Sequence, residues 1–599
     1  MRSFRMRLGT NCSVWLLAWV ALNHMVAIPT ANADRPSATV APAQPFPVKL
    51  LAHWPLTVNA QDKVSNSHAK SQGGVAFTKV AGRAAAEFNG RDGFLEVPHS
   101  PALALGRDDF SIALWAHPRR PLAGIPGDLI SKWDAVRRRG INFYMAGSSS
   151  AYSGVCDSRH VHFGIDDNHA GPERDHGMPW ASNSLISNLV VFKGKLYAGI
   201  ADAARAEDAA RVFRLEGNNW VNCGRLGDDP TIPSVMSMVV HDGRLYAGTG
   251  AWDWIRAFGQ VKDQPPPRST RVFVYNGDKG WDDLGAVGKG SRVLCLASFK
   301  GTLFAGLDRV GGGSLFRRDG ERWIDCGAPD GRNLENLMVW DGALHVATHG
   351  NMYRYEADGK FTCIGEAPHG ITQIHALHVL EGRLVAGTWP QGYILRYGGG
   401  KRWDIIGRLG LPMGQSEINE TNDLEVHNGA LFAGQLPLAE LYRYKNEQHW
   451  DRVRQLGRRA DFAEKNVDSW MRVTALASHH GRLFAGTGSC RGRSVDVDKD
   501  KSLGRVRSFG FGQMASHEHD LPTGWVHLTA VRRGTMLELY LNGKLVAKSL
   551  DAPARPLDVT TSTPLRIGLG ALTYFDGALA DVRLYRGALS AQEIAGLVR

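Results

Sequence analysis

The stretch LVVFKGKLYAG at residues 189–199 decides the fold, because its pattern recurs along most of the chain. Apolar residues alternate with others on both sides of a central glycine, which is typical of two strands joined by a tight turn. Three copies carry Asp-Gly or Asn-Gly at the turn, a strong hairpin signal. The pattern therefore predicts seven β-hairpins. The other six copies are MVVHDGRLYAG (238–248), LASFKGTLFAG (296–306), LMVWDGALHVA (337–347), LHVLEGRLVAG (377–387), LEVHNGALFAG (424–434) and LASHHGRLFAG (476–486).

A second repeated unit follows six of these seven hairpins. Its first copy, RVFRLEGNNWVNCG at 211–224, indicates another hairpin in which a tryptophan opens the last strand. Two hairpins give four strands per repeat, which is the strand count of a propeller blade. The sequence thus predicts a seven-bladed β-propeller whose last blade lacks its own second hairpin. We expect residues 162–177, HFGIDDNHAGPERDHG, to help complete that blade and close the ring, because a closed ring leaves no open sheet edge.

The segments on either side of the repeats have a different pattern. Before the repeats, AAEFNGRDGFLEVP at 85–98 indicates a hairpin and DDFSIALWAHP at 108–118 a strand. After them, GWVHLTAVRRGTMLELYLNGKLVAKS at 524–549 indicates three strands. Ser590 and Glu593 have the spacing of a capping box, which predicts a short C-terminal helix.

Together these flanking segments resemble the laminin-G-like, concanavalin A-type jelly roll of bacterial secreted proteins. The first half of the jelly roll precedes the repeats and the second half follows them, so the resemblance implies that the propeller is inserted into a loop of the jelly roll. The predicted fold is all-β, a concanavalin A-like (LamG-like) jelly-roll β-sandwich interrupted by a seven-bladed β-propeller. The matching pieces are AHWPL (52–56), AAEFNGRDGFLEVP, FSIALWAHP, LISKWD (129–134), GWVHLTAVRRG, LYLNGKLV, LRIG and FDGALADVRLYRGALSAQEI.

The expected boundaries follow from these segments. We expect a signal peptide at 1–33, a linker at 34–46, the first half of the jelly roll at 47–160, the propeller at 161–503 and the second half of the jelly roll at 504–599.

The first residues of the chain have the features of a secretory signal peptide. Three arginines precede an apolar stretch, and Ala31-Asn32-Ala33 supplies the small residues that a signal peptidase requires. The alternative is a membrane anchor, but the apolar stretch is short and interrupted by polar residues. We therefore expect an exported protein, extracellular or periplasmic, that is not integral to the membrane.

The charge of the chain indicates which partners are suitable. The formal net charge is +11, and removal of the signal peptide with its three arginines lowers it to +8. The basic residues are dispersed, and we interpret the densest run, Arg137-Arg138-Arg139, as solvated surface. Export and dispersed charge argue against a nucleic-acid partner, whereas an acidic polysaccharide or an anionic cell surface suits this charge.

Six cysteines remain after removal of the signal peptide, and export permits disulfides. Cys223, Cys326 and Cys363 occupy equivalent places in three outer hairpins, where we expect small buried residues. Cys156 precedes the repeats and Cys490 lies near their end. We therefore predict a Cys156–Cys490 disulfide that cross-links the two ends of the propeller where the ring closes.

The chain contains no nucleophile elbow, P-loop or zinc-protease motif, and no catalytic residue is assigned. Glu417, Glu420 and Asp423 in QSEINETNDLEV (415–426) are candidates for a general acid and base. We favour a solvated loop instead, because carboxylates from one loop rarely form an opposed pair. The histidine- and aspartate-rich run 160–176 is a candidate metal site, although alternating histidines in a strand often only face solvent.

Further candidates come from the resemblance. Jelly rolls of this kind often bind calcium through aspartate oxygens, and Asp576 and Asp581 in FDGALADV match the recurrent acidic positions. The alternative is that these aspartates close a turn and pair with an arginine. Sugar-binding members stack exposed aromatic rings on sugars, which makes Trp133 and Tyr152, both in predicted loops, ligand-binding candidates.

The resemblance implies a secreted, non-catalytic protein that binds carbohydrate or a glycosylated cell surface. One alternative is a secreted polysaccharide-active enzyme, a glycoside hydrolase or lyase, with its site on the propeller axis. Carboxylates that converge on the axis from several blades would favour this enzyme. Another alternative is a protein-interaction scaffold, because fold alone does not fix function. Calcium is the one candidate cofactor, and the oligomeric state stays open.

Overall fold

The computed structural model describes residues 47–121, 124–147, 156–180, 185–201, 209–252, 270–277, 279–308, 312–413, 416–457, 471–489 and 504–598. Nearly all regular structure in these ranges is β-strand, and the described C-terminus forms the helix α4 (Ala591–Leu597). Its predicted capping box is confirmed, because Ser590 and Glu593 exchange side-chain-to-backbone hydrogen bonds. No helix within these ranges has the length and apolarity needed to cross a membrane. The signal peptide and linker predicted for residues 1–46 lie outside the described residues.

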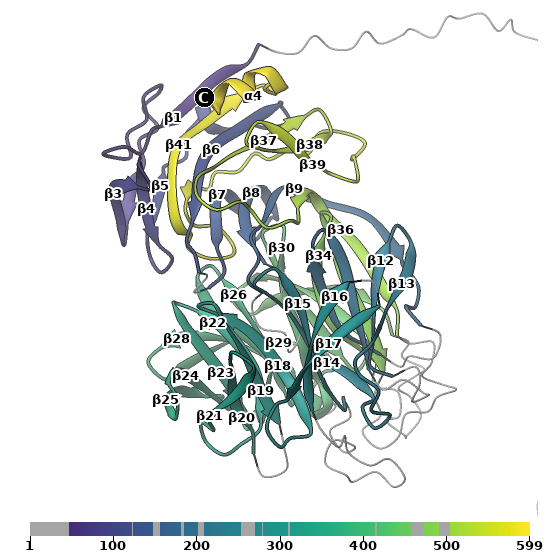
Figure 1. Cartoon of the computed structure of the whole chain (residues 1–599). Helices are drawn as coiled ribbons and strands as arrows, with labels where there is room; N and C mark the ends of the chain where they lie inside the picture. Colours follow the sequence, from purple (N-terminus) through teal and green to yellow (C-terminus); the bar gives the residue numbers. More distant parts are fainter. Residues whose placement is uncertain are drawn as a thin grey trace, which may run out of the picture. The chain divides into compact units, whose positions relative to one another are not determined.

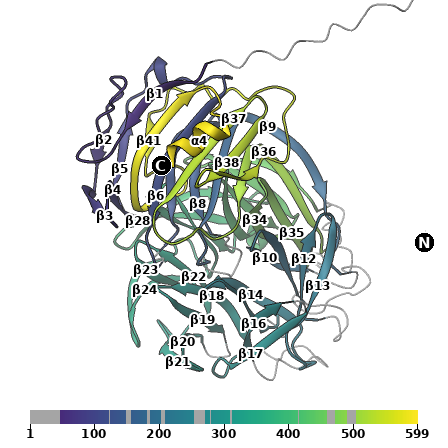
Figure 2. The same cartoon turned by 45° about the horizontal axis from the view of Figure 1, so that its top comes forward.

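The first sheet of a β-sandwich combines strands from both ends of the chain (Figures 1 and 2). Its strands are β1 (Lys49–Trp54), β3 (Val75–Val80), β4 (Arg83–Asn89), β6 (Phe110–Pro118), β37 (Val526–Arg533), β38 (Met536–Leu541), β39 (Lys544–Lys548) and β41 (Asp576–Arg586). The order is β3-β4-β41-β6-β37-β38-β39, and β1 pairs with the second half of β41. The last strand of the chain thus lies between two of the first.

The second sheet of the sandwich is assembled in the same way. Its strands are β2 (Lys70–Gln72), β5 (Phe94–Val97), β7 (Gly127–Asp134), β8 (Arg139–Ala146), β9 (His160–Asp175), β36 (Val506–His517) and β40 (Leu565–Ile567). The order is β36-β9-β8-β7-β40-β5-β2, so the C-terminal β40 lies between two N-terminal strands. This interleaving confirms the predicted jelly roll made of two separated halves.

Large apolar side chains fill the space between the two sheets. Trp54, Phe88, Phe110, Phe143 and Phe163 are completely buried in this core. Burial of each contributes on the order of 1.5–3 kcal/mol to folding. Because residues from both halves supply the core, neither half can bury its apolar face without the other.

The repeats form six blades of four consecutive antiparallel strands each within the described ranges. The blades are β10–β13 (Leu185–Phe192, Lys195–Ala201, Arg211–Glu216, Asn219–Arg225), β14–β17 (Ser234–His241, Arg244–Gly250, Arg271–Gly277, Gly280–Ala286), β18–β21 (Arg292–Phe299, Thr302–Asp308, Ser314–Asp319, Arg322–Gly327), β22–β25 (Leu334–Trp340, Ala343–Thr348, Asn351–Ala357, Lys360–Glu366), β26–β29 (Gln373–Leu380, Arg383–Trp389, Tyr393–Gly399, Arg402–Arg408) and β30–β33 (Glu420–His427, Ala430–Leu436, Glu440–Asn446, His449–Gln455).

The seventh blade is built from both sides of the insertion. Its inner strands are β34 (Met471–His479) and β35 (Arg482–Ser489), and the first residues of β36 pair with β35. The last residues of β9 then pair with β36 as the outermost strand. The expectation that a segment before the first repeat helps to complete the ring is confirmed, but that segment is one long strand and not a hairpin. Both β9 and β36 continue into the sandwich, where they pair again.

Neighbouring blades are joined by a repeated hydrogen bond. The innermost strand of each blade has a bulge, and in four blades the polar residue after the bulge reaches the next blade's innermost strand. These contacts join Asn188 to the Met236 carbonyl at 3.0 Å, Ser237 to the Val293 carbonyl at 2.9 Å, Asn336 to the His375 carbonyl at 2.6 Å and Asp423 to the Leu476 amide at 2.6 Å. The bonds satisfy buried polar groups that would otherwise destabilise the ring.

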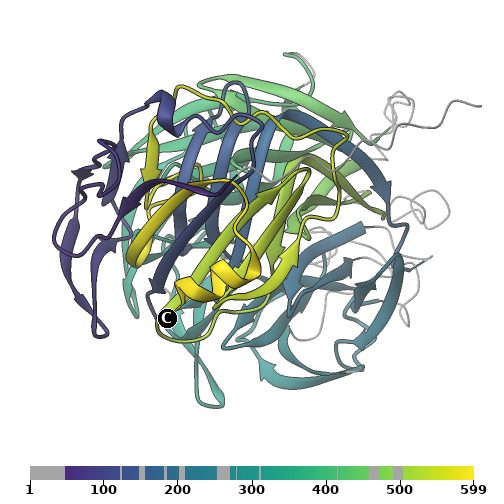
Figure 3. The same ribbon diagram turned by 90° about the horizontal axis from the view of Figure 1, so that it is seen from above.

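The seven recurring hairpin turns have positive φ at two successive residues, as type I′ turns require. The second residue is always glycine, whereas the first varies along the chain. We call these first residues the turn residues: Lys193, Asp242, Lys300, Asp341, Glu381, Asn428 and His480. Several of the turns contact the sandwich, as Asn428 donates to the Ile165 and Phe511 carbonyls and the Glu381 amide donates to the Ala571 carbonyl. Figure 3 views the sandwich strands in front of the blades.

Candidate functional site

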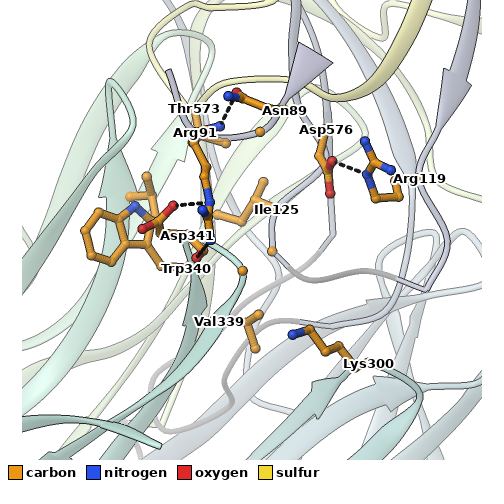
Figure 4. Close-up of a pocket in the computed structure, with 14 residues that line it drawn as sticks. Asn89, Arg91, Arg119, Ile125, Lys300, Val339, Trp340, Asp341, Thr573 and Asp576 are labelled. Carbon is orange, nitrogen blue, oxygen red and sulfur yellow. Dashed lines mark hydrogen bonds and ion pairs between the residues drawn. The ribbon is translucent and has the colours of Figure 1, made fainter. Parts of the chain in front are cut away.

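A cleft of about 290 Å³ opens between the sandwich and two of the blades (Figure 4). On the sandwich side it is lined by the β4–β5 turn, the residues after β6 and the start of β41. On the propeller side it is lined by the turns of the blades that begin with β18 and β22. Its polar and aromatic side chains include Asn89, Arg91, Arg119, Lys300, Trp340 and Asp576.

Arg91 links the sandwich to the turn residue Asp341. The Asn89 side-chain oxygen accepts the Arg91 backbone N–H at 3.0 Å, which orders the β4–β5 turn. The Arg91 Nε then lies 2.8 Å from Asp341 Oδ1. The carboxylate of Asp341 is therefore already paired with a cation of the protein.

Arg119 neutralises the second carboxylate of the cleft. Its Nε lies 2.7 Å from Asp576 Oδ1, and this hydrogen bond raises the pKa of Arg119. Lys300 has no such partner, because within the described ranges no carboxylate lies at ion-pair distance from its ammonium. Its Nζ lies 4.8 Å from the ring centroid of Phe299. Arg119 also lies 3.3 Å from Glu87 Oε1, outside the lining. Among the residues that line the cleft, Lys300 is the cation without a carboxylate partner in the described ranges.

Trp340 gives the cleft a rigid aromatic wall. Its indole Nε1 donates to the Gly382 carbonyl at 3.0 Å, and its ring packs edge to face on Tyr397 with centroids 5.5 Å apart. These contacts fix the orientation of a half-buried ring. An aromatic ring held in this way, beside amide and guanidinium donors, is typical of sites that bind polar ring-shaped ligands.

The two aspartates predicted as calcium ligands lie apart on β41. Asp576 lines the cleft and pairs with Arg119, whereas Asp581 lies 2.7 Å from His53 Nε2 and 2.9 Å from Arg583 Nε. Each aspartate is therefore paired with an arginine, as the alternative interpretation expects. Calcium binding by these residues stays a prediction.

The predicted sugar-stacking residues have different outcomes. Trp133 was expected in a loop, but it is half-buried in β7, because residues 127–134 pair with β8. It lines a second cavity of about 190 Å³ together with the turn residue Glu381 and Arg566. Tyr152 lies outside the described residues.

The described cysteines are free thiols. Cys156 is completely buried, and its sulfur accepts the Val240 N–H at 3.2 Å, so it packs as a small apolar residue beside β14. The predicted Cys156–Cys490 disulfide is not seen, and Cys490 lies outside the described residues. Cys223 and Cys326 are buried as expected, and Cys363 is partly exposed.

A second polar group lies on the inner strands, at the end away from the turns. Glu335 is the second residue of β22, Glu420 begins β30 and Arg472 is the second residue of β34. About six residues, or about 20 Å of strand, separate Glu335 from the turn of its blade. We call Glu335, His349, His375, Glu420 and Arg472 the axial cluster.

The axial cluster joins four blades through ion pairs. His375 lies 3.5 Å from Glu335 and 3.6 Å from Glu420, and Arg472 lies 3.5 Å from Glu420. His349 pairs with Glu335 and is the most exposed member, with 32% of its side chain exposed. Burial alone would raise the pKa of Glu335, but the His349 hydrogen bond and charge lower it. Conversely, burial lowers the pKa of His349 and Glu335 raises it, with a net rise.

The solvated-loop interpretation of residues 415–426 is wrong for two of its three carboxylates. Glu420 and Asp423 are buried in β30, and only Glu417 is exposed. Their partners are groups of other blades, so the sequence of one repeat does not reveal that these carboxylates are buried. The histidines at the start of the 160–176 run are also buried, since His160 and His162 lie in β9 inside the sandwich sheet.

Sequence reasoning did not find Lys300, Arg91, Arg119 or the members of the axial cluster other than Glu420. The repeats hold only a weak signal for Lys300: the residue before each repeated glycine varies, but so do the residues on either side of this pair. No comparable signal marks the two arginines, which lie in loops of the sandwich.

The chain was compared with protein families, curated proteins and solved structures. Residues 460–595 match the model of the concanavalin A-like lectin/glucanases superfamily. Comparison with curated proteins gave no match. Similar solved structures include a virginiamycin B lyase from Staphylococcus aureus, with 8% identity, a TM-score of 0.39 and coverage of 57% of this chain and 99% of that chain. The extracellular domain of a putative hybrid two-component system from B. thetaiotaomicron has 15% identity, a TM-score of 0.38 and coverage of 56% and 40%. The WD40 β-propeller domain of Doa1 has 12% identity, a TM-score of 0.38 and coverage of 57% and 97%.

Proposed function

We propose that this protein is an exported, carbohydrate-binding protein whose cleft between sandwich and propeller binds an acidic glycan. The observation that carries the proposal is Lys300, the one lysine that lines the cleft, without a carboxylate partner in the described part of the chain. A carboxylate or sulfate group on a sugar would supply that partner. The concanavalin A-like sandwich, a fold that often binds carbohydrate, supports the ligand class.

The rest of the cleft suits the same ligand. Trp340 presents a fixed ring on which a sugar can stack, and Asn89 and Thr573 lie within the same lining. The arginines are held by Asp341 and Asp576, so they keep their orientation before a ligand arrives. Preorganised groups of this kind lose little conformational freedom on binding.

The test compares two lysines in the same structural position. Lys300→Ala should weaken binding to an acidic glycan by about 10-fold or more, because a hydrogen bond to a charged group contributes about 1.5–3 kcal/mol. Lys193→Ala is the matched control, since Lys193 is a turn residue whose Nζ lies 4.9 Å from the Phe192 ring centroid. Binding is measured on an array of acidic and neutral glycans, with calcium and with a chelator.

Three results would contradict the proposal: equal effects of the two substitutions, equal binding of neutral and acidic glycans, or no binding to any glycan. The arm with chelator separately tests calcium. Loss of binding there would support the calcium prediction for Asp576 and Asp581, whereas unchanged binding would reject it and leave the cleft proposal intact.

A second candidate function is cleavage of a glycan at the axial cluster. The specific observation is that Glu335 and Glu420, from different blades, both contact His375. His349 beside the ionised Glu335 has a raised pKa, which suits a general acid near neutral pH. Such an arrangement supplies the acid and base that glycosidic bond cleavage requires.

This candidate is tested by the release of reducing ends from polysaccharides. His349→Ala should lower the rate by about 100-fold, which is the lower range for loss of a general acid. His369→Ala is the control, because His369 is an exposed histidine of the loop between β25 and β26. Absence of cleavage by the unmodified protein, or equal rates for both variants, would reject the enzyme and leave the binding proposal untouched.

A further inference from the structure

Two histidines of the seventh blade meet a buried glutamate of the sandwich. His479 ends β34, His480 is the turn residue that follows it, and Glu518 comes directly after β36. His479 Nδ1 lies 2.6 Å from Glu518 Oε2, and His480 Nδ1 lies 3.6 Å from the same oxygen. The His480 backbone N–H donates to the other carboxylate oxygen at 2.5 Å.

No arginine or lysine competes for the Glu518 carboxylate in the described part of the chain. Within the described ranges the ion-pair partners of Glu518 are the imidazoles of His479 and His480. The carboxylate and His479 are buried, whereas 47% of the His480 side chain is exposed. The group therefore has one open side, toward solvent at His480.

We propose that His479, His480 and Glu518 bind a divalent transition metal, with zinc as the expected ion. One donor atom from each residue lies within 4.8 Å of the other two. A tetrahedral zinc ion with bonds of about 2.0–2.2 Å places its donors about 3.4 Å apart. The observed separations of 2.6 and 3.6 Å fall on either side of that value, so only small side-chain movements are needed to admit the ion.

The chemistry of the donors selects the metal. Imidazole nitrogen suits zinc and its neighbours in the first transition row, whereas calcium takes six to eight oxygen ligands. Three protein ligands leave a fourth position, which the exposed side at His480 opens to water. This group is distinct from the aspartates of β41 and from the cleft.

The position of the group predicts what the metal does. The segment that carries Glu518 also contacts the first blade, where the Gly194 N–H donates to the Glu518 carbonyl at 2.9 Å. The first and seventh blades are neighbours in the ring, since Leu185 pairs with Gly488 at the other end of their strands. A bound ion would therefore cross-link the closure of the ring to the sandwich, and it should raise the unfolding temperature by mass action.

The experiment uses the full chain after removal of metal by a chelator. Zinc is titrated in competition with a chromogenic chelator, and cobalt is titrated in parallel because tetrahedral cobalt absorbs visible light. We expect one zinc ion per chain and a rise in unfolding temperature on zinc addition. His480→Ala should weaken zinc binding by at least about 10-fold, since even loss of an outer-shell partner costs this much. His449→Ala, at an exposed histidine of β33, should change nothing.

The outcomes separate the proposal from general effects on folding. The His480 side chain is 47% exposed, and alanine keeps the backbone N–H that donates to Glu518, so this substitution should change the metal-free unfolding temperature little. Glu518→Gln is the second variant, and it should remove the cobalt absorption. Absence of stoichiometric zinc binding by the unmodified chain, or equal affinity in the His480 and His449 variants, would overturn the proposal. Glycan binding by the cleft is scored separately with Lys300→Ala, so failure of one proposal does not imply failure of the other.

Discussion

Replacement of Arg138 by methionine should lower the free energy of unfolding by about 3–5 kcal/mol, because it removes the cation that faces a buried carboxylate. The side chains of Arg138 and Asp166 are 5% and 1% exposed and form an ion pair. Arg138 also donates to the His169 carbonyl. The pair lies where β9 passes from the sandwich to the seventh blade, so its loss should loosen the connection between the two parts. Chemical denaturation at pH 8 measures the effect.

Two further variants isolate the ion pair. Arg137→Met is the matched control, because the Arg137 side chain is 73% exposed and its pairing with Asp134 is worth at most about 1 kcal/mol. Asp166→Asn combined with Arg138→Met should recover much of the loss, since no uncompensated charge remains. Burial raises the pKa of Asp166 to about 7, so the cost of Arg138→Met should shrink at pH 5, where the carboxyl binds a proton. An equal cost for the exposed and the buried arginine would contradict this account.

This pair also shows where sequence reasoning fails. The run 137–139 was interpreted as solvated surface, yet its middle arginine is buried. Adjacent residues of a strand or turn point in different directions, so one arginine of a run can be buried while its neighbour is exposed. Only the partner, Asp166, distinguishes them, and it lies 28 positions later in the chain. The same holds for Glu420, whose environment is built by His375 and Arg472 of other blades.

The architecture was predictable because its signals are local and repeated. Each copy of the hairpin pattern predicts two strands joined by a tight turn, and seven copies predict the ring. The completion of the seventh blade was predictable in outline, since the last repeat lacks two strands. The long course of β9 was not predictable, because residues 160–167 pair with β8 in the sandwich and residues 173–175 continue along β36 in the blade.

The candidate sites were mostly not predictable, for a physical reason. The repeats fix the backbone of each turn and leave the first turn residue free to vary. Lys300, Asp341 and His480 occupy equivalent positions, but each meets a different part of the sandwich. Lys300 faces the cleft, Asp341 pairs with Arg91 and His480 lies beside Glu518. The role of each turn residue therefore depends on which part of the sandwich its turn contacts.

The free energy of unfolding of the unmodified protein should fall as pH rises from about 4 to 7, and Asp128→Asn should abolish this fall. Burial raises the pKa of Asp128 from 3.8 to about 7, although its carboxylate accepts the Thr573 N–H at 2.8 Å and the Leu572 N–H at 3.0 Å. Between these two pKa values the folded state keeps a proton that the unfolded state releases. The free energy of unfolding therefore falls with rising pH, by up to about 4 kcal/mol.

The measurement is chemical denaturation at a series of pH values from 4 to 8. Asparagine does not titrate and keeps an oxygen that can accept a backbone N–H, so the variant should become more stable than the unmodified protein as pH rises. Asp319→Asn, at a side chain that is 68% exposed, should follow the unmodified curve. If the Asp128 variant ran parallel to the unmodified protein across this range, burial of an ionised carboxylate would not be the cause. Asp128 accepts the backbone N–H of Thr573, which lines the cleft. Asparagine can accept the same N–H, so the variant should still bind glycan at pH 8.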